Sequence, residues 1–265
     1  MADLSLFTPW KRFLALPIDS RPKTLLVAFL VSALCALLVT GATVVLRPIQ
    51  QANRAAEQQL RLEALISAIP GMNEVLAEAG GGALSTVVID LKQVAATDLP
   101  PFDLPSALEE SDAWTPLTTE QDLASIGGRP NLVQVFFLRD GGDVRLVVLP
   151  IFGVGHGGMI EAMIAIRGDM NTIAGLTVTH QSETPGLGAR IEEPTWQASF
   201  AGKSLRDEGG TMRFSVARGH ATSEFEVDGI TGATRTSNAI QRMVRFWMGQ
   251  DGYGPLLDAI RRGEF

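Results

Sequence analysis

The sequence predicts an α+β protein in which a single N-terminal transmembrane helix precedes a domain with a mainly antiparallel sheet and flanking helices. Three observations predict it: an uncharged apolar stretch near the N-terminus, several β-branched segments separated by glycine turns after residue 126, and one amphipathic segment near the C-terminus. We expect four regions: an N-terminal tail (1–23), a transmembrane helix (24–46), a helix with a linker or N-terminal lobe (47–125), and a C-terminal domain (126–265).

The charge of the chain is negative and unevenly distributed. The 265 residues carry a formal charge of −7, from 22 basic and 29 acidic side chains. Residues 1–23 hold four basic and two acidic residues, a balance of +2, so the rest of the chain carries −9. An acidic main part repels phosphate backbones, which argues against nucleic acid as a partner. The only cysteine, Cys35, excludes a disulfide within the chain, and the three scattered histidines lack the spacing of a metal site.

The apolar stretch 24–46 has the length of a membrane span. Its 23 residues carry no charge, and at about 1.5 Å per residue a helix of this length crosses a hydrocarbon core of roughly 30 Å. The apolar region of a signal peptide is usually only about 7–15 residues long, so a cleaved signal is the weaker alternative. Basic residues are denser before the stretch than after it. We therefore expect a single pass with a cytoplasmic N-terminus. In a bacterium, the span would cross the inner membrane and the main domain would face the periplasm.

The segment between the anchor and residue 126 mixes helix, strand and loop signals. Good helix formers and an apolar stripe predict a helix over 51–69, which Pro70 and Gly71 end. A short strand is expected at 86–91, and the proline-rich stretch 98–108 is expected to be loop and linker.

Four strands are predicted after residue 126. Segments 132–138 and 144–152 are rich in β-branched residues and enclose an Asp-Gly-Gly turn, which is typical of a hairpin. Segments 159–166 and 173–180 are further strand candidates. Several strands with one helix near the end indicate a mainly antiparallel sheet.

The stretch 153–158 matches the pattern G-x-G-x-x-G, which is a feature of dinucleotide-binding folds. Such a fold also needs a long crossover helix after the pattern and an acidic residue roughly 20 residues further on. Here another predicted strand follows at once, and no acidic residue lies near residue 178. A glycine-rich connection between strands is the better interpretation.

The loop 180–190, HQSETPGLGAR, is the second glycine-rich site. Pro185, Gly186 and Gly188 predict a tight turn with an accessible backbone. Its N–H groups can approach a bound planar or anionic group without interference from side chains. An ordinary surface loop explains the same residues equally well.

The third site begins at Asp228 and reads DGITGATRTSNAIQRMVRFWM. Its glycines predict a turn, its hydroxyl residues supply an N-cap, and an apolar face at helical spacing follows. A helix start has unpaired N–H groups and a positive dipole end, so phosphate is a suitable ligand. A routinely capped helix is the alternative, and the residues alone leave both open.

Taken together, these residues resemble a known family. The run 228–234, DGITGAT, resembles the flavinylation motif of the covalent FMN-binding domain family, and the SETPGLGAR loop resembles the other half of that flavin site. The segment PIQQANRAAEQQ after the anchor and the tail WMGQDGYGPLL (247–257) are similar to the C subunit of the sodium-translocating NADH:quinone reductase. The resemblance covers nearly the whole chain.

The resemblance implies a cofactor and a role for each matching residue. FMN would be esterified through its phosphate to Thr234, and Gly232 and Ala233 would leave room for a flavin transferase. Asp228 and Thr231 would belong to the sequence that this enzyme recognises. Thr236 would lie beside the phosphate. Five further residues would line the flavin: Glu183, Thr184, Gly186, Leu187 and Gly188.

The resemblance also implies an electron relay among other membrane subunits of the reductase, with no separate reaction at this chain. Such a subunit would take one electron at a time from an iron centre and pass it to a flavin in a membrane subunit. The phosphoester leaves the flavin ring unmodified, so the hydrogen bonds and charges around the ring would set its potential. Three alternatives remain: the G subunit of a ferredoxin:NAD oxidoreductase complex, a flavin-free anchored structural module, and a nicotinamide enzyme that uses residues 153–158.

Overall fold

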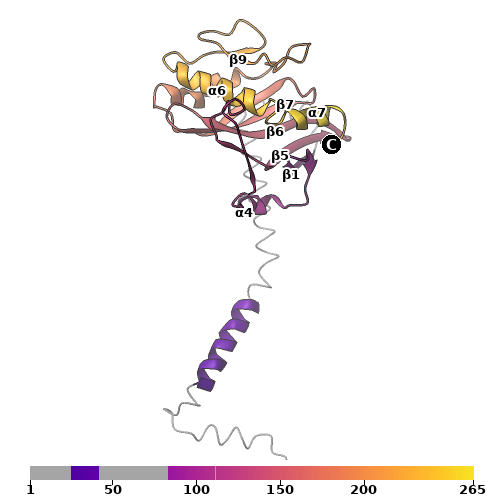
Figure 1. Cartoon of the computed structure of the whole chain (residues 1–265), viewed down its shortest axis with the longest axis vertical. Helices are drawn as coiled ribbons and strands as arrows, with labels where there is room; N and C mark the ends of the chain where they lie inside the picture. Colours follow the sequence, from indigo (N-terminus) through magenta and orange to yellow (C-terminus); the bar gives the residue numbers. More distant parts are fainter. Residues whose placement is uncertain (1–24, 42–82, 111) are drawn as a thin grey trace, which may run out of the picture. The chain divides into compact units, whose positions relative to one another are not determined.

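The computed structural model describes residues 25–41, 83–110 and 112–265 (Figure 1). The chain forms two compact units, residues 1–63 and 64–265. The predicted boundary at residue 126 stays a prediction, although two strands from before that residue belong to the sheet described below.

The described part of the first unit is one helix over residues 25–41. Its apolar side chains are exposed around the helix, with Leu25 and Leu37 71% and 72% accessible. A helix that is apolar on every side lacks the polar face of a helix at a protein–water boundary. Within the described residues, no helix combines the length and hydropathy needed to cross a membrane. The predicted span 24–46 extends beyond this helix at both ends, and the predicted helix 51–69 lies outside the described residues.

The second unit is built on a six-stranded antiparallel sheet with the order β2-β1-β5-β6-β7-β8. This confirms the predicted α+β class with a mainly antiparallel sheet, and all four strands predicted after residue 126 are present. The strands are β1 (Ala83–Asp90), β2 (Ala95–Ala96), β5 (Leu132–Asp140), β6 (Asp143–Val154), β7 (Met159–Arg167) and β8 (Ile173–His180).

The β5–β6 hairpin turns at the predicted Asp-Gly-Gly sequence. Asp140 pairs with Asp143, and the two glycines between them have φ values of 61° and 114°. Positive φ at both central positions is what a two-residue hairpin turn needs to match the twist of its strands, and glycine adopts it without steric strain.

Short elements surround the sheet. The stretch expected to be loop at 98–108 contains two helical turns, since proline at the first helical positions is compatible with a helix start. The short elements are η1 (Pro101–Asp103), α4 (Leu104–Ala107), β3 (Trp114–Pro116) paired with β4 (Gly128–Pro130), η2 (Gly188–Glu192), α5 (Pro194–Ala198), and β9 (Ser215–Val216) paired with β10 (Glu226–Val227).

Two C-terminal helices, α6 (Thr234–Trp247) and α7 (Gly254–Arg261), lie along one face of the sheet (Figure 1). Alternate strand residues such as Val135, Leu149 and Ile164 form one apolar cluster with the buried sides of both helices. Each fully buried large apolar side chain contributes about 2 kcal/mol, so this interface stabilises the position of α6 on the sheet.

Two hydrogen bonds link the C-terminal region to β6. The indole N–H of Trp247 donates to the carbonyl of Phe152 at 2.7 Å, and the hydroxyl of Tyr253 donates to the carbonyl of Pro150, also at 2.7 Å. Burial raises the pKa of Tyr253, so its hydroxyl stays protonated and keeps this bond. Both bonds fix the position of the two C-terminal helices relative to β6, the strand that leads to the glycine-rich connection.

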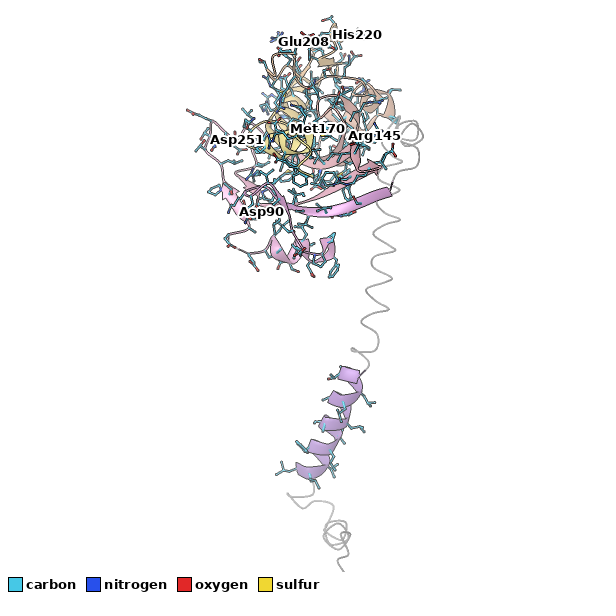
Figure 2. The ribbon with its side chains drawn as sticks, turned by 90° about the vertical axis from the view of Figure 1, so that its right-hand side faces the viewer. Asp90, Arg145, Met170, Glu208, His220 and Asp251 are labelled. Atoms are coloured by element: carbon cyan, nitrogen blue, oxygen red, sulfur yellow. The ribbon has the colours of Figure 1, made fainter. Side chains whose placement is uncertain are left out.

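Figure 2 shows the side chains of this unit, with Asp90 at the end of β1 and His220 near the opposite end of the unit. The His220 end carries the loops around β9 and β10. The motif that begins at Asp228 follows β10 directly, so it belongs to this end.

Candidate functional site

Three predicted segments meet at one end of the sheet. Strand β6 ends at Val154, β7 begins at Met159 and β8 ends at His180. In an antiparallel sheet these three ends lie at the same edge. The glycine-rich connection and the SETPGLGAR loop are therefore neighbours. One side chain of the loop links both of them to the first turn of α6.

That side chain is Glu183, which is only 5% exposed. Its Oε1 accepts the backbone N–H groups of His156 and Gly157 at 2.6 and 3.0 Å. Its Oε2 accepts the hydroxyl of Thr236, the third residue of α6, at 2.7 Å. A buried carboxylate needs such donors, because without them the loss of hydration is very unfavourable. Glu183 thus links all three segments.

Glycine is required where the backbone approaches Glu183. A methyl group at position 155 would collide with Oε1 of Glu183, and one at position 188 would collide with Oε2 and with Thr236. A methyl group at position 157 would collide with the carbonyl of Ser182. The stretch 153–158 joins two antiparallel strands and its N–H groups bind a carboxylate, which confirms the predicted strand connection and explains its glycines without a dinucleotide.

The rest of the SETPGLGAR loop forms an exposed turn. The carbonyl of Thr184 accepts the N–H groups of Leu187 and Ala189, both at 3.1 Å. Gly186 has a φ of 75° and no atom near the position of a side chain, so the surface above it is open. The apolar side chain of Leu187 is 47% exposed. An open backbone beside an exposed apolar side chain is suitable for a planar ligand.

The motif that begins at Asp228 runs beside this turn. A methyl group at Gly232 would lie 3.4 Å from Cδ2 of Leu187, so the loop and the motif are in contact. Gly232 has a φ of 82°, which favours glycine. Gly229 donates its N–H to the carbonyl of Gly219 at 2.8 Å, and a side chain there would collide with the carbonyl of Ala217. Both motif glycines therefore serve the path of the backbone.

Thr234 is the first residue of α6 and is exposed. Its hydroxyl stands at the helix N-terminus, where unpaired N–H groups and the helix dipole favour negative charge. The prediction of a hydroxyl N-cap is wrong: the capping position is Ala233, with no side-chain hydrogen bond. The reason is that α6 begins at Thr234, so the capping position falls on Ala233, which has no hydroxyl, while Thr236 and Ser237 lie inside the first turn. Thr236 donates to Glu183, and Ser237 accepts the N–H of Ile230 at 3.1 Å.

Asp228 has internal partners. Its Oδ1 accepts the N–H of Ala221 at 2.6 Å, and its Oδ2 lies 3.3 Å from Nδ1 of His220. The bond from Ala221 lowers the pKa of Asp228 most, partial burial opposes it, and His220 lowers it further, so the net shift is downward. The carbonyl of Asp228 accepts the indole N–H of Trp196 at 2.8 Å, which ties the motif to α5.

A hollow of about 280 Å³ lies between the start of the motif and α5. We call it the motif hollow. Its walls include Arg190, Glu193, Trp196, His220, Asp228 and Thr231. The sequence had indicated Asp228, Thr231 and, as the last residue of the SETPGLGAR loop, Arg190. Glu193, Trp196 and His220 carried no signal of their own, because they approach the motif only in the folded chain.

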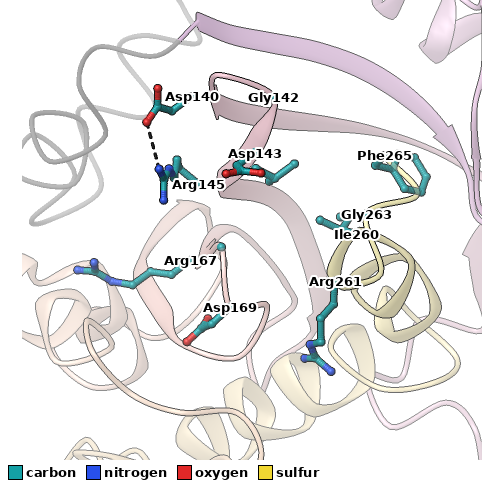
Figure 3. A pocket seen from close by; sticks show the side chains of 12 residues that line it. Asp140, Gly142, Asp143, Arg145, Arg167, Asp169, Ile260, Arg261, Gly263 and Phe265 are labelled. Atoms are coloured by element: carbon teal, nitrogen blue, oxygen red, sulfur yellow. Dashed lines mark hydrogen bonds and ion pairs between the residues drawn. The ribbon is translucent and has the colours of Figure 1, made fainter.

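Another hollow, of about 690 Å³, lies elsewhere (Figure 3). It is bounded by the β5–β6 turn, the β7–β8 turn and the C-terminus, and it includes an ion pair of 3.2 Å between Arg145 and Asp140. None of the predicted site residues lines it. These turns occupy the edge of the sheet opposite to the three segments, so its size does not bear on the site.

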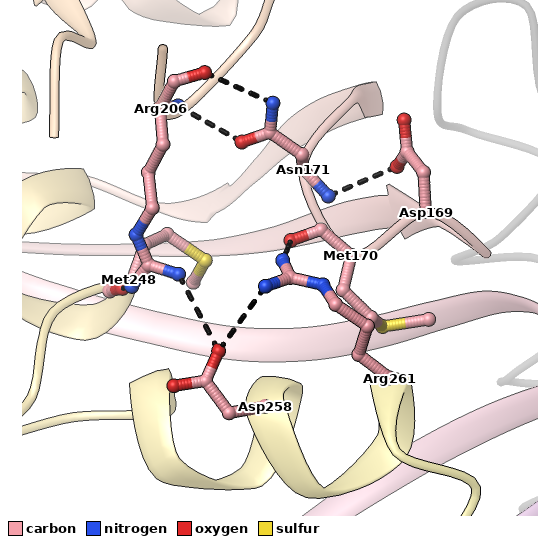
Figure 4. Close-up of polar contacts among 7 residues, drawn as sticks. All are labelled: Asp169, Met170, Asn171, Arg206, Met248, Asp258 and Arg261. Atoms are coloured by element: carbon pink, nitrogen blue, oxygen red, sulfur yellow. Dashed lines mark hydrogen bonds and ion pairs between the residues drawn. The ribbon is translucent and has the colours of Figure 1, made fainter. Parts of the chain in front are cut away.

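The β7–β8 turn beside that hollow is firmly held (Figure 4). The side chain of Asn171 exchanges two hydrogen bonds with the backbone of Arg206, at 2.9 and 3.0 Å. Asp258 of α7 lies 3.9 Å from the guanidinium of Arg206 and 3.4 Å from that of Arg261, which also donates to the carbonyl of Met170 at 3.2 Å. This network stabilises the end of the sheet away from the site.

The predicted site residues divide into two groups. A buried group, Glu183, Gly188 and Thr236, is joined by hydrogen bonding and close packing. An exposed or partly exposed group surrounds it and comprises Thr184, Gly186, Leu187, Asp228, Thr231, Gly232 and Thr234. Ala233 is 7% exposed, so its small side chain lies in the core rather than on the accessible surface. The roles predicted for these residues toward a flavin stay predictions.

Comparison with known proteins gives three consistent results. Residues 155–249 match the family model of the FMN-binding domain, a range that contains both the SETPGLGAR loop and the motif. The C subunit of the Na(+)-translocating NADH-quinone reductase of Yersinia pestis is 37% identical over 254 residues, which cover 92% of this chain and 95% of that protein. The corresponding protein of Vibrio anguillarum is 36% identical over 251 residues, covering 92% and 97%.

Solved structures agree in fold. The crystal structure of Shewanella oneidensis NqrC superposes with a TM-score of 0.63 at 27% identity, covering 72% of this chain and 88% of that one. The C subunit of the Na(+)-translocating NADH-quinone reductase from Parabacteroides distasonis, at 22% identity, shares the fold with a TM-score of 0.53 and covers 80% of this chain and 96% of that one.

Proposed function

Because this chain belongs to the family of the C subunits of Na(+)-translocating NADH-quinone reductases, we propose that it carries one FMN on Thr234 and relays electrons within such a reductase. The observation that carries the attachment site is the position of Thr234: an exposed hydroxyl at a helix N-terminus without a side-chain cap, inside the range that matches an FMN-binding domain.

The residues around Thr234 fit a phosphate-linked flavin. The first turn of α6 offers N–H groups to a phosphate. The open turn with Thr184, Gly186 and Leu187 offers backbone groups and an apolar surface to a planar ring. Glu183 and Thr236 act from below this surface, since their side chains bind each other and hold the turn, the glycine connection and α6 together.

Attachment is a phosphoryl transfer without a change of oxidation state. Free FMN would have to expel hydroxide, a poor leaving group, so an activated donor such as flavin adenine dinucleotide is required. Oγ of Thr234 would form the new bond to the FMN phosphorus, the P–O bond of the pyrophosphate bridge would break, and AMP would leave. The hydroxyl proton passes to a base of the flavin transferase. When bound, FMN supplies one- and two-electron transfer at its ring, which the phosphoester leaves unmodified.

The relay role suits a tethered cofactor. A site that exchanges electrons with neighbouring subunits has to stay accessible, and an ester bond prevents loss of the flavin from such a site. The partners are the other membrane subunits of the reductase and, during maturation, the flavin transferase. In this proposal the apolar stretch 24–46 anchors the chain in the inner membrane of a bacterium, with the N-terminus in the cytoplasm and the flavin domain in the periplasm.

The test of the attachment site is mass spectrometry of the denatured full-length chain after co-expression with a flavin transferase. Wild type gains the mass of FMN less one water. Trypsin cleaves after Arg218 and Arg235, so the peptide 219–235 carries the increment, and fragmentation assigns it to Thr234 rather than to Thr222 or Thr231. Thr234→Ala abolishes the increment, whereas Thr211→Ala, an exposed threonine outside the motif, keeps it. An increment that persists in Thr234→Ala disproves the site. A wild-type chain that gains no increment, although the transferase modifies a control substrate, is the flavin-free module.

A further inference from the structure

We propose that the exposed side of α6 is a docking surface for an acidic face of the neighbouring reductase subunit that exchanges electrons with this chain. We call this surface the arginine face and define it by Arg235, Arg242 and Arg245. The inference rests on the proposed relay through Thr234, and it adds the surface on which the electron partner binds.

The three arginines lie on one side of the helix. An α-helix has 3.6 residues per turn, which places their side chains within an arc of about 80°. Arg235 and Arg242 are exposed, and Arg245 is partly exposed. The other accessible residues on this side include Asn238 and Gln241, whereas every apolar side chain of α6 is buried. The arginine face is therefore polar and positively charged along its length.

The arginine face has no counter-charge within the described part of the chain. None of its three side chains forms a hydrogen bond or an ion pair with another described residue. The sequence has no acidic residue between Asp228 and Asp251. By contrast, residues 64–265 carry 15 basic and 25 acidic side chains, a balance of −10. The arginine face is thus a positive surface on a negative unit, and its charges are available to an external anion.

The stability of α6 does not explain these charges. Arg235 lies in the first turn, where the helix dipole disfavours a cation. Arg242 and Arg245 are three positions apart, and like charges on neighbouring helix positions repel each other. Only Arg245, in the last turn, benefits from the dipole. An external acidic partner accounts for all three arginines.

The chemistry of the arginine face favours a protein over a membrane as this partner. A helix that binds a lipid surface presents apolar side chains beside its basic ones, and these enter the boundary of the acyl chains. The apolar side of α6 is instead buried in the core of the second unit. Guanidinium groups form paired hydrogen bonds with carboxylates, which suits an acidic protein surface.

The position of the arginine face favours an electron partner. Arg235 follows Thr234 directly, and Arg242 lies about 12 Å from Thr234 along the helix axis. A protein seated on the arginine face is therefore beside the proposed flavin, and electron exchange requires close approach of the two redox groups. Contacts between exposed charges speed the encounter and weaken with salt. Such contacts suit a relay that has to bind and release its partners.

Two double variants of the assembled reductase in detergent test the proposal. The neutral variant, Arg242→Gln with Arg245→Gln, removes both charges and keeps good helix formers. The lysine variant, Arg242→Lys with Arg245→Lys, keeps the charges and introduces two amines into a helix without lysine. Arg235 is left unchanged because it adjoins the attachment site. The control, Arg145→Lys, introduces an amine beside Asp140 at the opposite edge of the sheet. Covalent FMN content and Tm are measured for each complex.

The first readout is coupling with a carbodiimide, which joins an amine to a carboxylate in contact with it. Mass spectrometry of the digested complex identifies the linked peptides. We expect the amines introduced at positions 242 and 245 to be linked to acidic residues of another subunit. The control links position 145 to Asp140 and shows that the reagent has reacted. A lysine variant without links to another subunit, when the control has reacted, overturns the proposal.

The second readout is the rate at which the flavin of this subunit is reduced after rapid mixing with NADH. At low ionic strength we expect the neutral variant to be slower than wild type by more than roughly threefold and the lysine variant to stay within that limit. The difference shrinks at high salt, because salt screens exposed charges.

Three kinetic outcomes overturn the proposal. In the first, the neutral variant carries FMN and stays within roughly threefold of the wild-type rate. In the second, its slowing persists undiminished at high salt, as a purely structural effect would. In the third, it is slow only in vesicles of anionic phospholipid and not in detergent, which identifies a membrane surface as the partner. If wild type itself carries no covalent FMN, the proposed function fails instead.

Discussion

Glu183 determines the local structure of the site. One carboxylate accepts two backbone N–H groups from the glycine connection and one hydroxyl from α6, and each bond joins segments that are distant in sequence. Hydrogen bonds to a charged group are about twice as strong as neutral ones, so these three contacts rigidify the support beneath Thr234. A rigid support keeps an attached cofactor in one orientation.

Position 155 requires glycine because the carboxylate of Glu183 leaves no room for a side chain there. We expect Gly155→Ala to lower the free energy of unfolding by about 2 kcal/mol, because the added methyl group collides with Oε1 of Glu183 and with the side chain of Ile160. The measurement is the thermal midpoint of the full-length chain in detergent. Gly219→Ala is the matched control, since no atom lies within 4 Å of its added methyl group. Equal midpoints for the two variants would contradict this role of the glycine connection.

At the residue scale, sequence patterns predicted some of these partners but not their contacts. The motif glycines, Thr234 and the turn glycines were identifiable, since turn chemistry is local. The bonds of Trp196 to Asp228 and of Glu183 to Thr236 join residues 32 and 53 positions apart. Such contacts follow from tertiary packing, and a single sequence contains no local signal for them.

At the scale of elements, strand prediction succeeded because β-branched residues and turn glycines follow local rules. Strands β5 to β8 lie within a few residues of the predicted segments. Helix α7 was not predicted, because its eight residues follow a glycine-rich tail and begin with Gly254 and Pro255. Its place is determined by contacts with distant elements, such as the approach of Asp258 to Arg206.

The β7–β8 turn makes a prediction about pH. Partial burial raises the pKa of Asp169, but the hydrogen bonds from Thr172 and Asn171 outweigh it, so the net shift is downward. A carboxylate with a lowered pKa stabilises the fold above its unfolded pKa of about 3.9, and the effect is lost as the pH falls through the folded value. We therefore expect Asp169→Asn to lower Tm at pH 7, and the difference from wild type to shrink below about pH 4.

Thermal melts from pH 3 to pH 7, at about one-unit steps, measure this dependence. Asp98→Asn changes an exposed aspartate elsewhere in the second unit and is the control. A difference between Asp169→Asn and wild type that stays constant over this range would show that the charge of Asp169 contributes nothing to the turn.

At the scale of the whole molecule, the proposed membrane anchor is the part of the account that a fractionation experiment tests. We expect the full-length chain to remain in the membrane fraction after alkaline carbonate extraction. The double variant Leu34→Arg with Leu37→Arg should move it to the supernatant, because each arginine at the centre of a span costs roughly 3 kcal/mol on insertion. Leu123→Arg, at an exposed leucine of the second unit, should leave the chain in the membrane. Retention of the double variant in the membrane would contradict anchoring by this helix.

Electrons are expected to pass through a flavin held on Thr234, and the most direct measurement of this is NADH-driven quinone reduction by the assembled reductase. Complexes with Thr234→Ala and with Thr211→Ala are purified and compared at equal content of this subunit. We predict that Thr211→Ala reduces quinone at the rate of wild type, whereas Thr234→Ala lacks covalent FMN in this subunit and does not reduce quinone. A Thr234→Ala complex that contains the subunit in normal amount and reduces quinone at the rate of wild type would contradict a relay through Thr234.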